Sequence, residues 1–161
     1  MNPAKATLKN KAADAGLRDF DRSLPMSLLR AREAVMKKFI PSLKEHMLSP
    51  QQWRVIRSLE QEDGLDISEV SKRCYLLVPS MSRIIKNLES RQLIKRESVE
   101  NDQRCTALYL TPKGRELFKL IAPKSEERYD YITQKFGDKK LERLYKLLDE
   151  LVVVLDDEES L

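Results

Sequence analysis

The residues best able to do chemistry gather between positions 79 and 87. They are hydroxyls, an amide and two cations, and at 3.6 residues per turn they share one side of a helix whose other side is apolar. Hydroxyl and amide groups hydrogen-bond to base edges, Arg bonds guanine through two donors, and Lys neutralises phosphate. The pattern therefore predicts a helix that reads the major groove of DNA. The predicted contacts are Pro79, Ser80, Ser82, Arg83, Lys86 and Asn87.

An ordinary solvated helix face is the alternative, because every amphipathic helix has a polar side. The next residues favour DNA: the β-prone segments 93–99 and 105–110 flank the polar stretch 100–104, which predicts a hairpin. A helix-turn-helix followed by a basic hairpin has the order of elements of a winged helix. At the tip, Asp102 can hold Arg104 extended toward the narrow minor groove; otherwise the two form a surface ion pair of little energetic consequence.

Helical spacing and capping signals predict the elements that carry this surface. Ser49-Pro50 and Asp66 are N-cap signals for two helices, and Thr111-Pro112 begins a third. Pro41 and Pro123 fall inside predicted helices and should bend them. The expected fold is mostly α with a small β-hairpin. We expect helices over 25–47, 50–59, 66–73, 78–90 and 112–136 and from 138 onward, after a mobile N-terminal arm of residues 1–22.

Composition narrows the class of protein. The chain has 161 residues, 41% of them hydrophobic and 35% charged, with a net charge of +4. Residues 66–115 carry an excess of four positive charges and residues 116–161 an excess of four negative ones, which suits a polyanion-binding face on a scaffold that repels nucleic acid elsewhere. No phosphate-binding loop or nucleophile elbow is present, so we expect neither an enzyme nor a cofactor. The lack of a long apolar run or signal sequence predicts a cytoplasmic protein with no membrane partner.

The two cysteines leave one alternative open. Cys74 and Cys105 lie far apart and form no CxxC pair, and with a single histidine they cannot easily supply a metal site. We interpret both as packed thiols. The alternative is a thiol-redox-sensing DNA-binding regulator that uses one of them.

Several segments together resemble the MarR family of transcriptional regulators. They are the run 79–89 (PSMSRIIKNLE), then Leu93-Ile94-Lys95-Arg96, Asn101-Asp102-Gln103-Arg104 and Leu110-Thr111-Pro112-Lys113-Gly114. The resemblance spans residues 24–155, and 28–34 with 51–54 look like the branch of homoprotocatechuate and hydroxycinnamate repressors.

That resemblance implies a homodimer on a palindromic operator, with 78–90 as recognition helix and 99–105 as wing. It assigns residues 49–111 to a winged helix-turn-helix domain, and 23–48 with 112–158 to a helical dimerisation region. Pro123 departs from the family's usual continuous helix. The expected function is a repressor of aromatic-acid catabolism genes, released by an aromatic carboxylate or its thioester.

One cation points to an effector site. Arg32 falls within the apolar arc of the predicted helix 25–47, where a guanidinium needs an anion, either a bound carboxylate or a protein one such as Glu33 of the other subunit. Trp53 either stacks on an aromatic ligand or belongs to the core. Ser23 caps its helix or bonds the ligand, and Arg30 adds positive charge. Ser23, Arg30, Arg32 and Trp53 are thus the predicted ligand-binding residues.

Overall fold

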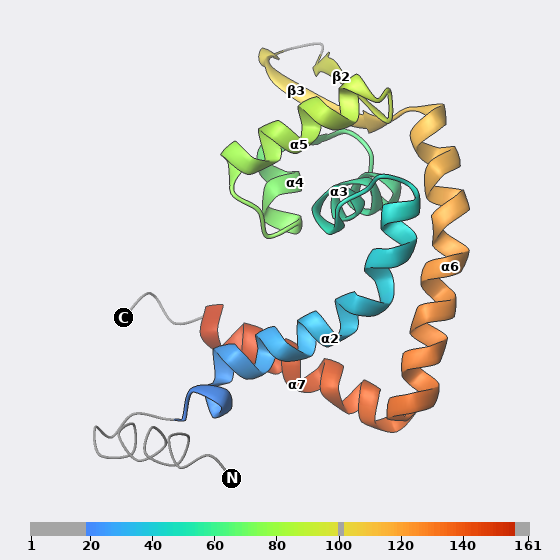
Figure 1. The fold of residues 1–161 in the computed structure, drawn as a ribbon. Helices are drawn as coiled ribbons and strands as arrows, with labels where there is room; N and C mark the ends of the chain where they lie inside the picture. The colour runs from blue at the N-terminus through green and yellow to red at the C-terminus, as the bar shows by residue number, and fades with distance from the viewer. Residues whose placement is uncertain (1–18, 100–101, 157–161) are drawn as a thin grey trace, which may run out of the picture. The chain divides into compact units, whose positions relative to one another are not determined.

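The computed structural model describes residues 19–99 and 102–156, and the side chains of residue 99 and of residues 102–105 lie outside the described part (Figure 1). Contacts divide the chain into two compact units, residues 1–41 and 42–161. The helices are the 3-10 helix η1 (Phe20–Arg22) and the α-helices α2 (Leu24–Glu45), α3 (Pro50–Gln61), α4 (Ile67–Arg73), α5 (Val78–Ser90), α6 (Pro112–Phe136) and α7 (Asp138–Asp156).

The first unit contains η1 and α2 as far as Pro41. The Asp19 carboxylate accepts the backbone N–H of Asp21 and caps η1, and the Arg30 guanidinium donates to the Asp21 carbonyl at 2.8 Å. Within the described residues, the first helix thus begins at Phe20, inside the segment 1–22 that the sequence predicts to be a mobile arm. Residues 1–18 of that arm lie outside the described residues.

Capping side chains set the starts of α3 and α4, as the sequence predicts. The Ser49 hydroxyl accepts the Gln52 N–H while the Gln52 side chain accepts the Ser49 N–H, so both halves of a capping box form. Asp66 caps α4 by accepting the N–H of Glu69. The apolar faces of α3, α4 and α5 meet in one core, whose fully buried side chains include Val55, Ile56, Leu59, Val70, Met81, Ile85 and Leu88.

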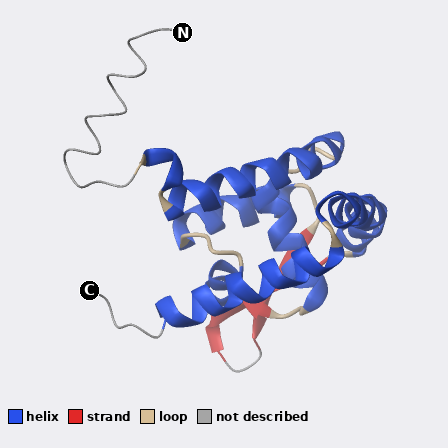
Figure 2. Ribbon diagram, turned by 90° about the horizontal axis from the view of Figure 1, so that it is seen from below, coloured by secondary structure: helices blue, strands red, loops and turns tan. Residues whose placement is uncertain are grey.

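A three-stranded antiparallel sheet closes this core. Its strands β1 (Leu65–Asp66), β2 (Ile94–Val99) and β3 (Asp102–Leu110) lie in the order β1-β3-β2, and Figure 2 shows them gathered in one place among the helices. The predicted hairpin is β2 and β3. β1 was not predicted, because two residues are too few for a periodic pattern. Its pairing with β3 ties the chain before α4 to the hairpin.

The long helices run without interruption through their prolines: α2 contains Pro41 and α6 contains Pro123. The absence of an amide hydrogen at Pro123 removes one backbone hydrogen bond but does not end α6. α6 instead ends at Gly137, whose φ of 98° few other residues adopt.

The junction of α6 with β2 depends on the absence of a side chain at Gly114. A Cβ there would overlap the backbone carbonyl oxygen of Leu93 and would lie 3.2 Å from the Leu110 Cδ2 atom. This close approach allows the Thr111 N–H to bond the Leu93 carbonyl while the Thr111 side chain caps α6 at Gly114.

We predict that Gly114→Ala lowers the free energy of unfolding by about 2 to 3 kcal/mol, because backbone must move to admit the methyl group. Urea denaturation followed by circular dichroism measures this. Lys119→Ala, at an exposed position of α6, is the control and should change stability little. A Gly114→Ala protein as stable as wild type would contradict the packing described.

Candidate nucleic-acid interface and adjoining cavity

Helix α5 buries one side completely and exposes the other. Met81, Ile85 and Leu88 are fully buried, as their spacing predicts, and they fix the rotation of the helix about its axis. The polar side therefore faces solvent. All six residues predicted to contact DNA are exposed: Pro79, Ser80, Ser82, Arg83, Lys86 and Asn87.

Asn87 has a structural contact that sequence reasoning missed. Its side-chain oxygen accepts a hydrogen bond of 2.7 Å from the Gln52 amide, and Gln52 also completes the capping box at the start of α3. Gln52 therefore links the first turn of α3 to the exposed side of α5. The amide nitrogen of Asn87 remains a donor group, so a contact with DNA is compatible with this bond.

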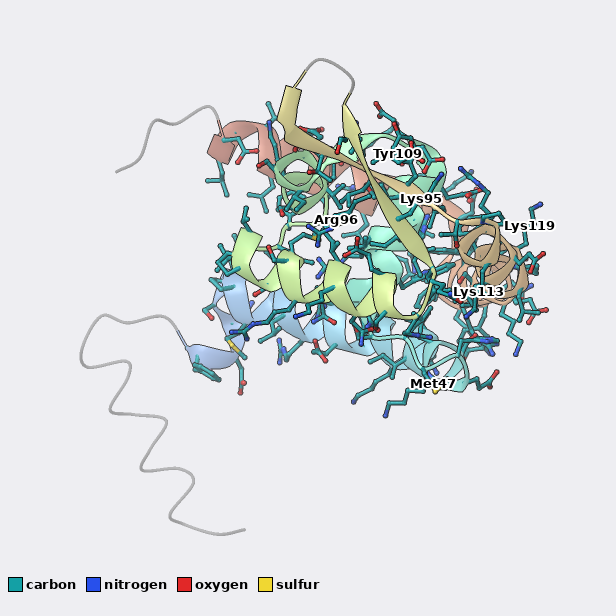
Figure 3. All side chains as sticks on the ribbon, turned by 90° about the horizontal axis from the view of Figure 1, so that it is seen from above. Met47, Lys95, Arg96, Tyr109, Lys113 and Lys119 are labelled. Carbon is teal, nitrogen blue, oxygen red and sulfur yellow. The ribbon has the colours of Figure 1, made fainter. Side chains whose placement is uncertain are left out.

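The cations of α5 differ from those of the hairpin. Within the described residues, Arg83 and Lys86 form no ion pair, whereas Arg96 pairs with Glu89 at 2.9 Å and Lys95 with Glu97 at 2.5 Å. The Lys95 ammonium also lies 5.8 Å from the centre of the Tyr109 ring on the neighbouring strand (Figure 3). Of these four described cations, Arg83 and Lys86 are therefore the two that carry no ion pair and can neutralise phosphate or bond guanine.

Asp102 and Arg104, the predicted wing contacts, are residues of β3. Their side chains lie outside the described part of the chain, so the proposed ion pair between them stays a prediction.

A cavity of about 560 Å³ opens beside α3 within the second unit. Of its cations, Arg73 is neutralised by Glu62 and Glu69, but Arg54 and Arg57 form no ion pair among the described residues. The cavity therefore has positive charge without a protein counterion. Its lining residues are Arg54, Arg57, Ser58, Glu60, Gln61, Arg73, Cys74 and Phe118.

Two polar groups beside this cavity lack partners, although the Arg54 Nη1 donates to the Cys74 carbonyl at 2.7 Å. Among the described atoms, the Arg54 Nε and the Ser58 hydroxyl are buried without hydrogen-bond partners, which costs free energy unless a bound acceptor satisfies them. The Arg57 guanidinium donates to the Tyr129 hydroxyl at 3.2 Å. A carboxylate fits such a set of donors.

Aromatic rings support the cavity wall. Trp53 is buried and stacks on Phe118, with ring centroids 5.5 Å apart and planes 21° apart. Because Phe118 lines the cavity, an aromatic ligand would meet a ring backed by a second ring. The sequence prediction named Trp53 and missed Arg54, Arg57, Ser58 and Tyr129. One sequence signal could have pointed to Arg57: it lies four residues after Trp53 on one helix, so the two side chains are neighbours on the helix surface.

The other predicted effector residues belong to the first unit. The Ser23 hydroxyl donates to the Phe20 carbonyl at 2.9 Å, and Arg30 bonds the Asp21 carbonyl. Arg32 is about half exposed, at 52%, and pairs at 2.6 Å with Glu33 of the same chain. The sequence predicted that Arg32 would pair with a bound carboxylate or with a protein carboxylate such as Glu33 of the other subunit. In this structure the pairing carboxylate is Glu33 of the same chain.

Cys74 is poorly suited to redox sensing. Its side chain is 2% exposed, and burial raises the pKa of the thiol, although the positive charge of Arg54 partly opposes this effect. A raised pKa lowers the fraction of reactive thiolate at neutral pH. The Cys105 side chain lies outside the described residues.

The described residues contain no cluster of His, Cys, Asp and Glu that could hold a metal. None of the described helices has an apolar stretch that could span a bilayer.

Comparison with known proteins identifies the family. Residues 48–106 match the model of the MarR family. The regulator FarR of Neisseria gonorrhoeae is 37% identical over 83% of this chain and 92% of its own length, and the homoprotocatechuate degradative operon repressor of Escherichia coli is 36% identical over 82% and 89%. The chain belongs to the MarR family. A solved structure of NadR with 4-hydroxyphenylacetate superimposes with a TM-score of 0.75 at 34% identity, covering 83% of this chain and 98% of that one.

Membership of the MarR family confirms the winged helix-turn-helix fold expected from the sequence. It also makes this protein a DNA-binding transcriptional regulator and not an enzyme. That residues 78–90, which form α5, are the recognition helix and residues 99–105 the wing stays a prediction.

Arg83→Ala should weaken binding to the preferred duplex by about 1 to 3 kcal/mol and relax the base preference at one position, if Arg83 bonds guanine through two donors. A duplex selected from a random pool by the full-length protein, followed by fluorescence anisotropy with single-base variants, measures both effects. Lys119→Ala is the control at an exposed site on α6. Unchanged affinity and base preference in Arg83→Ala would remove Arg83 from the interface.

Proposed function

We propose that this MarR-family protein is a homodimeric repressor of genes for aromatic-acid catabolism, released from a palindromic operator by an aromatic carboxylate, such as a hydroxycinnamate, or by its thioester. Its relative in Escherichia coli is named as a repressor of homoprotocatechuate degradation, and NadR was crystallised with 4-hydroxyphenylacetate. Both names point to phenolic acids. The proposed DNA contacts are Pro79, Ser80, Ser82, Arg83, Lys86, Asn87, Asp102 and Arg104.

A homodimer is supported by the apolar surface of α7. This helix has no buried residue within the single chain, although leucines and valines follow each other at helical spacing. Exposed apolar groups in such number mark an interface. The residues are Leu144, Tyr145, Leu147, Val152, Val153, Val154 and Leu155.

The cavity beside α3 carries the proposal for the effector. Its volume suits a small molecule, Arg54 and Arg57 offer positive charge without a protein counterion, and the Phe118 ring offers an aromatic wall. A phenolic acid satisfies all three features at once. The carboxylate would bond Arg57, and the ring would lie against Phe118. Ser23, Arg30, Arg32 and Trp53 remain proposed contributors on the basis of the sequence.

Isothermal titration calorimetry with 4-hydroxyphenylacetate, dihydroxyphenylacetate, ferulate, coumarate and the coenzyme A thioesters of the last two tests the effector. At least one should bind and release the selected duplex, and Arg57→Ala should weaken that binding about 10- to 100-fold, because a charge-assisted hydrogen bond to the carboxylate is lost. Arg32→Ala tests the contact predicted from the sequence.

The control is Lys119→Ala, which removes one positive charge as Arg57→Ala does and should bind the effector as wild type does. If none of these acids binds, or if the acid that binds leaves DNA affinity unchanged, the proposed effector class is wrong. If Arg57→Ala binds normally, the cavity is not the effector site.

A further inference from the structure

The turn between α4 and α5 presents an apolar tip to solvent. The apolar tip consists of Tyr75, Leu77 and Val78, whose side chains are 83%, 78% and 47% exposed. The turn lies at the end of α5 that is farther from the strands following it (Figure 1). Helical spacing places Leu77 and Val78 on the buried side of α5, and the structure contradicts this. Leu77 has extended backbone and precedes the helix, so helical spacing does not govern its direction.

The exposure of the apolar tip is imposed by a well-formed turn. The N–H of Tyr75 bonds the Lys72 carbonyl at 3.1 Å, and the N–H of Leu76 bonds the Ser71 carbonyl at 3.0 Å. Leu76, between the exposed residues, packs against the core. Tyr75 and Leu77 therefore have little freedom to turn inward, and their exposure belongs to the folded state.

Tyr75 and Leu77 are both unfavourable residue types for their backbone positions. Tyr75 has a φ of 49°, a conformation in which Gly or Asn is usual. Leu77 is the N-cap of α5 and makes no side-chain capping bond, whereas Ser49, Asp66 and Thr111 cap α3, α4 and α6. Leu is among the poorest N-cap residues. Residues that are locally unfavourable at an exposed site mark that site as a candidate functional surface.

We propose that Leu77, with Val78 beside it, reads thymine by contacting C5-methyl groups in the major groove. This inference rests on the DNA-binding part of the proposed function. The apolar tip lies at the N-terminal end of α5, with Leu77 three and six residues before the exposed Ser80 and Arg83, and recognition helices contact base edges with their N-terminal residues. The thymine methyl is the apolar group that the major groove offers to an apolar side chain.

Charge favours DNA over a protein as the occupant of this surface. The cations nearest in sequence on α5, Arg83 and Lys86, form no ion pair among the described residues. An apolar tip next to such cations suits a polyanion that carries methyl groups between its phosphates.

Replacing thymine by deoxyuridine removes the methyl group and leaves base pairing intact. In a duplex selected from a random pool by the full-length wild-type protein, we expect deoxyuridine at one or more thymines of each half-site to weaken wild-type binding about three- to fivefold, the effect of burying one methyl group. Leu77→Ser should bind the thymine and deoxyuridine duplexes equally. Because Ser is a good N-cap, the same variant should melt at a higher temperature than wild type, which excludes misfolding as the cause.

Leu120→Ala is the matched control, because Leu120 is an exposed leucine of α6 at 57% exposure and should leave the deoxyuridine penalty unchanged. The inference is overturned if no thymine in the duplex is sensitive, or if Leu77→Ser keeps the full wild-type penalty. If the wild-type protein selects no duplex at all, the DNA-binding function itself fails and the inference with it. The experiment therefore distinguishes a failure of the thymine contact from a failure of DNA binding.

Discussion

The structure depends on the burial of one side of α5. Met81, Ile85 and Leu88 are inserted into the core, so the helix cannot rotate without exposing three large apolar side chains, at roughly 1.5 to 3 kcal/mol each. That constraint holds Arg83 and Lys86 at the surface. The sheet, the capped helices α3 and α4 and the first turns of α6 all pack around the same side chains.

The C-terminal part of α5 is tied to other elements. Asn87, three residues before the end of the helix, accepts a bond from Gln52 on α3, and just after the last turn Arg91 donates to the carbonyls of His46 and Met47. α3 also carries two of the three arginines that line the cavity, Arg54 and Arg57. An effector that displaces α3 would act on α5 through the bond between Gln52 and Asn87. A changed spacing between the two copies of α5 would then be enough to weaken binding to two half-sites.

Local signals predicted most of the fold. Ser49, Asp66 and Thr111 cap helices where the sequence predicted them, and the β2–β3 hairpin appears as expected. β1 escaped prediction because its two residues gain stability only from pairing with β3. The cavity was not predicted, because Arg57 and Tyr129 lie 72 residues apart in the sequence and only tertiary packing brings them together. Helical spacing alone would also put Leu77 on the buried side of α5, but a helical wheel does not describe a residue with extended backbone.

The central claim is that two copies of α5 are presented together to one face of duplex DNA. Hydroxyl-radical footprinting of the full-length protein on its selected duplex tests this most directly. The account predicts two protected patches on the same face, centred ~34 Å apart, which is one helical turn of DNA. A single patch, or uniform protection without preferred positions, would contradict it.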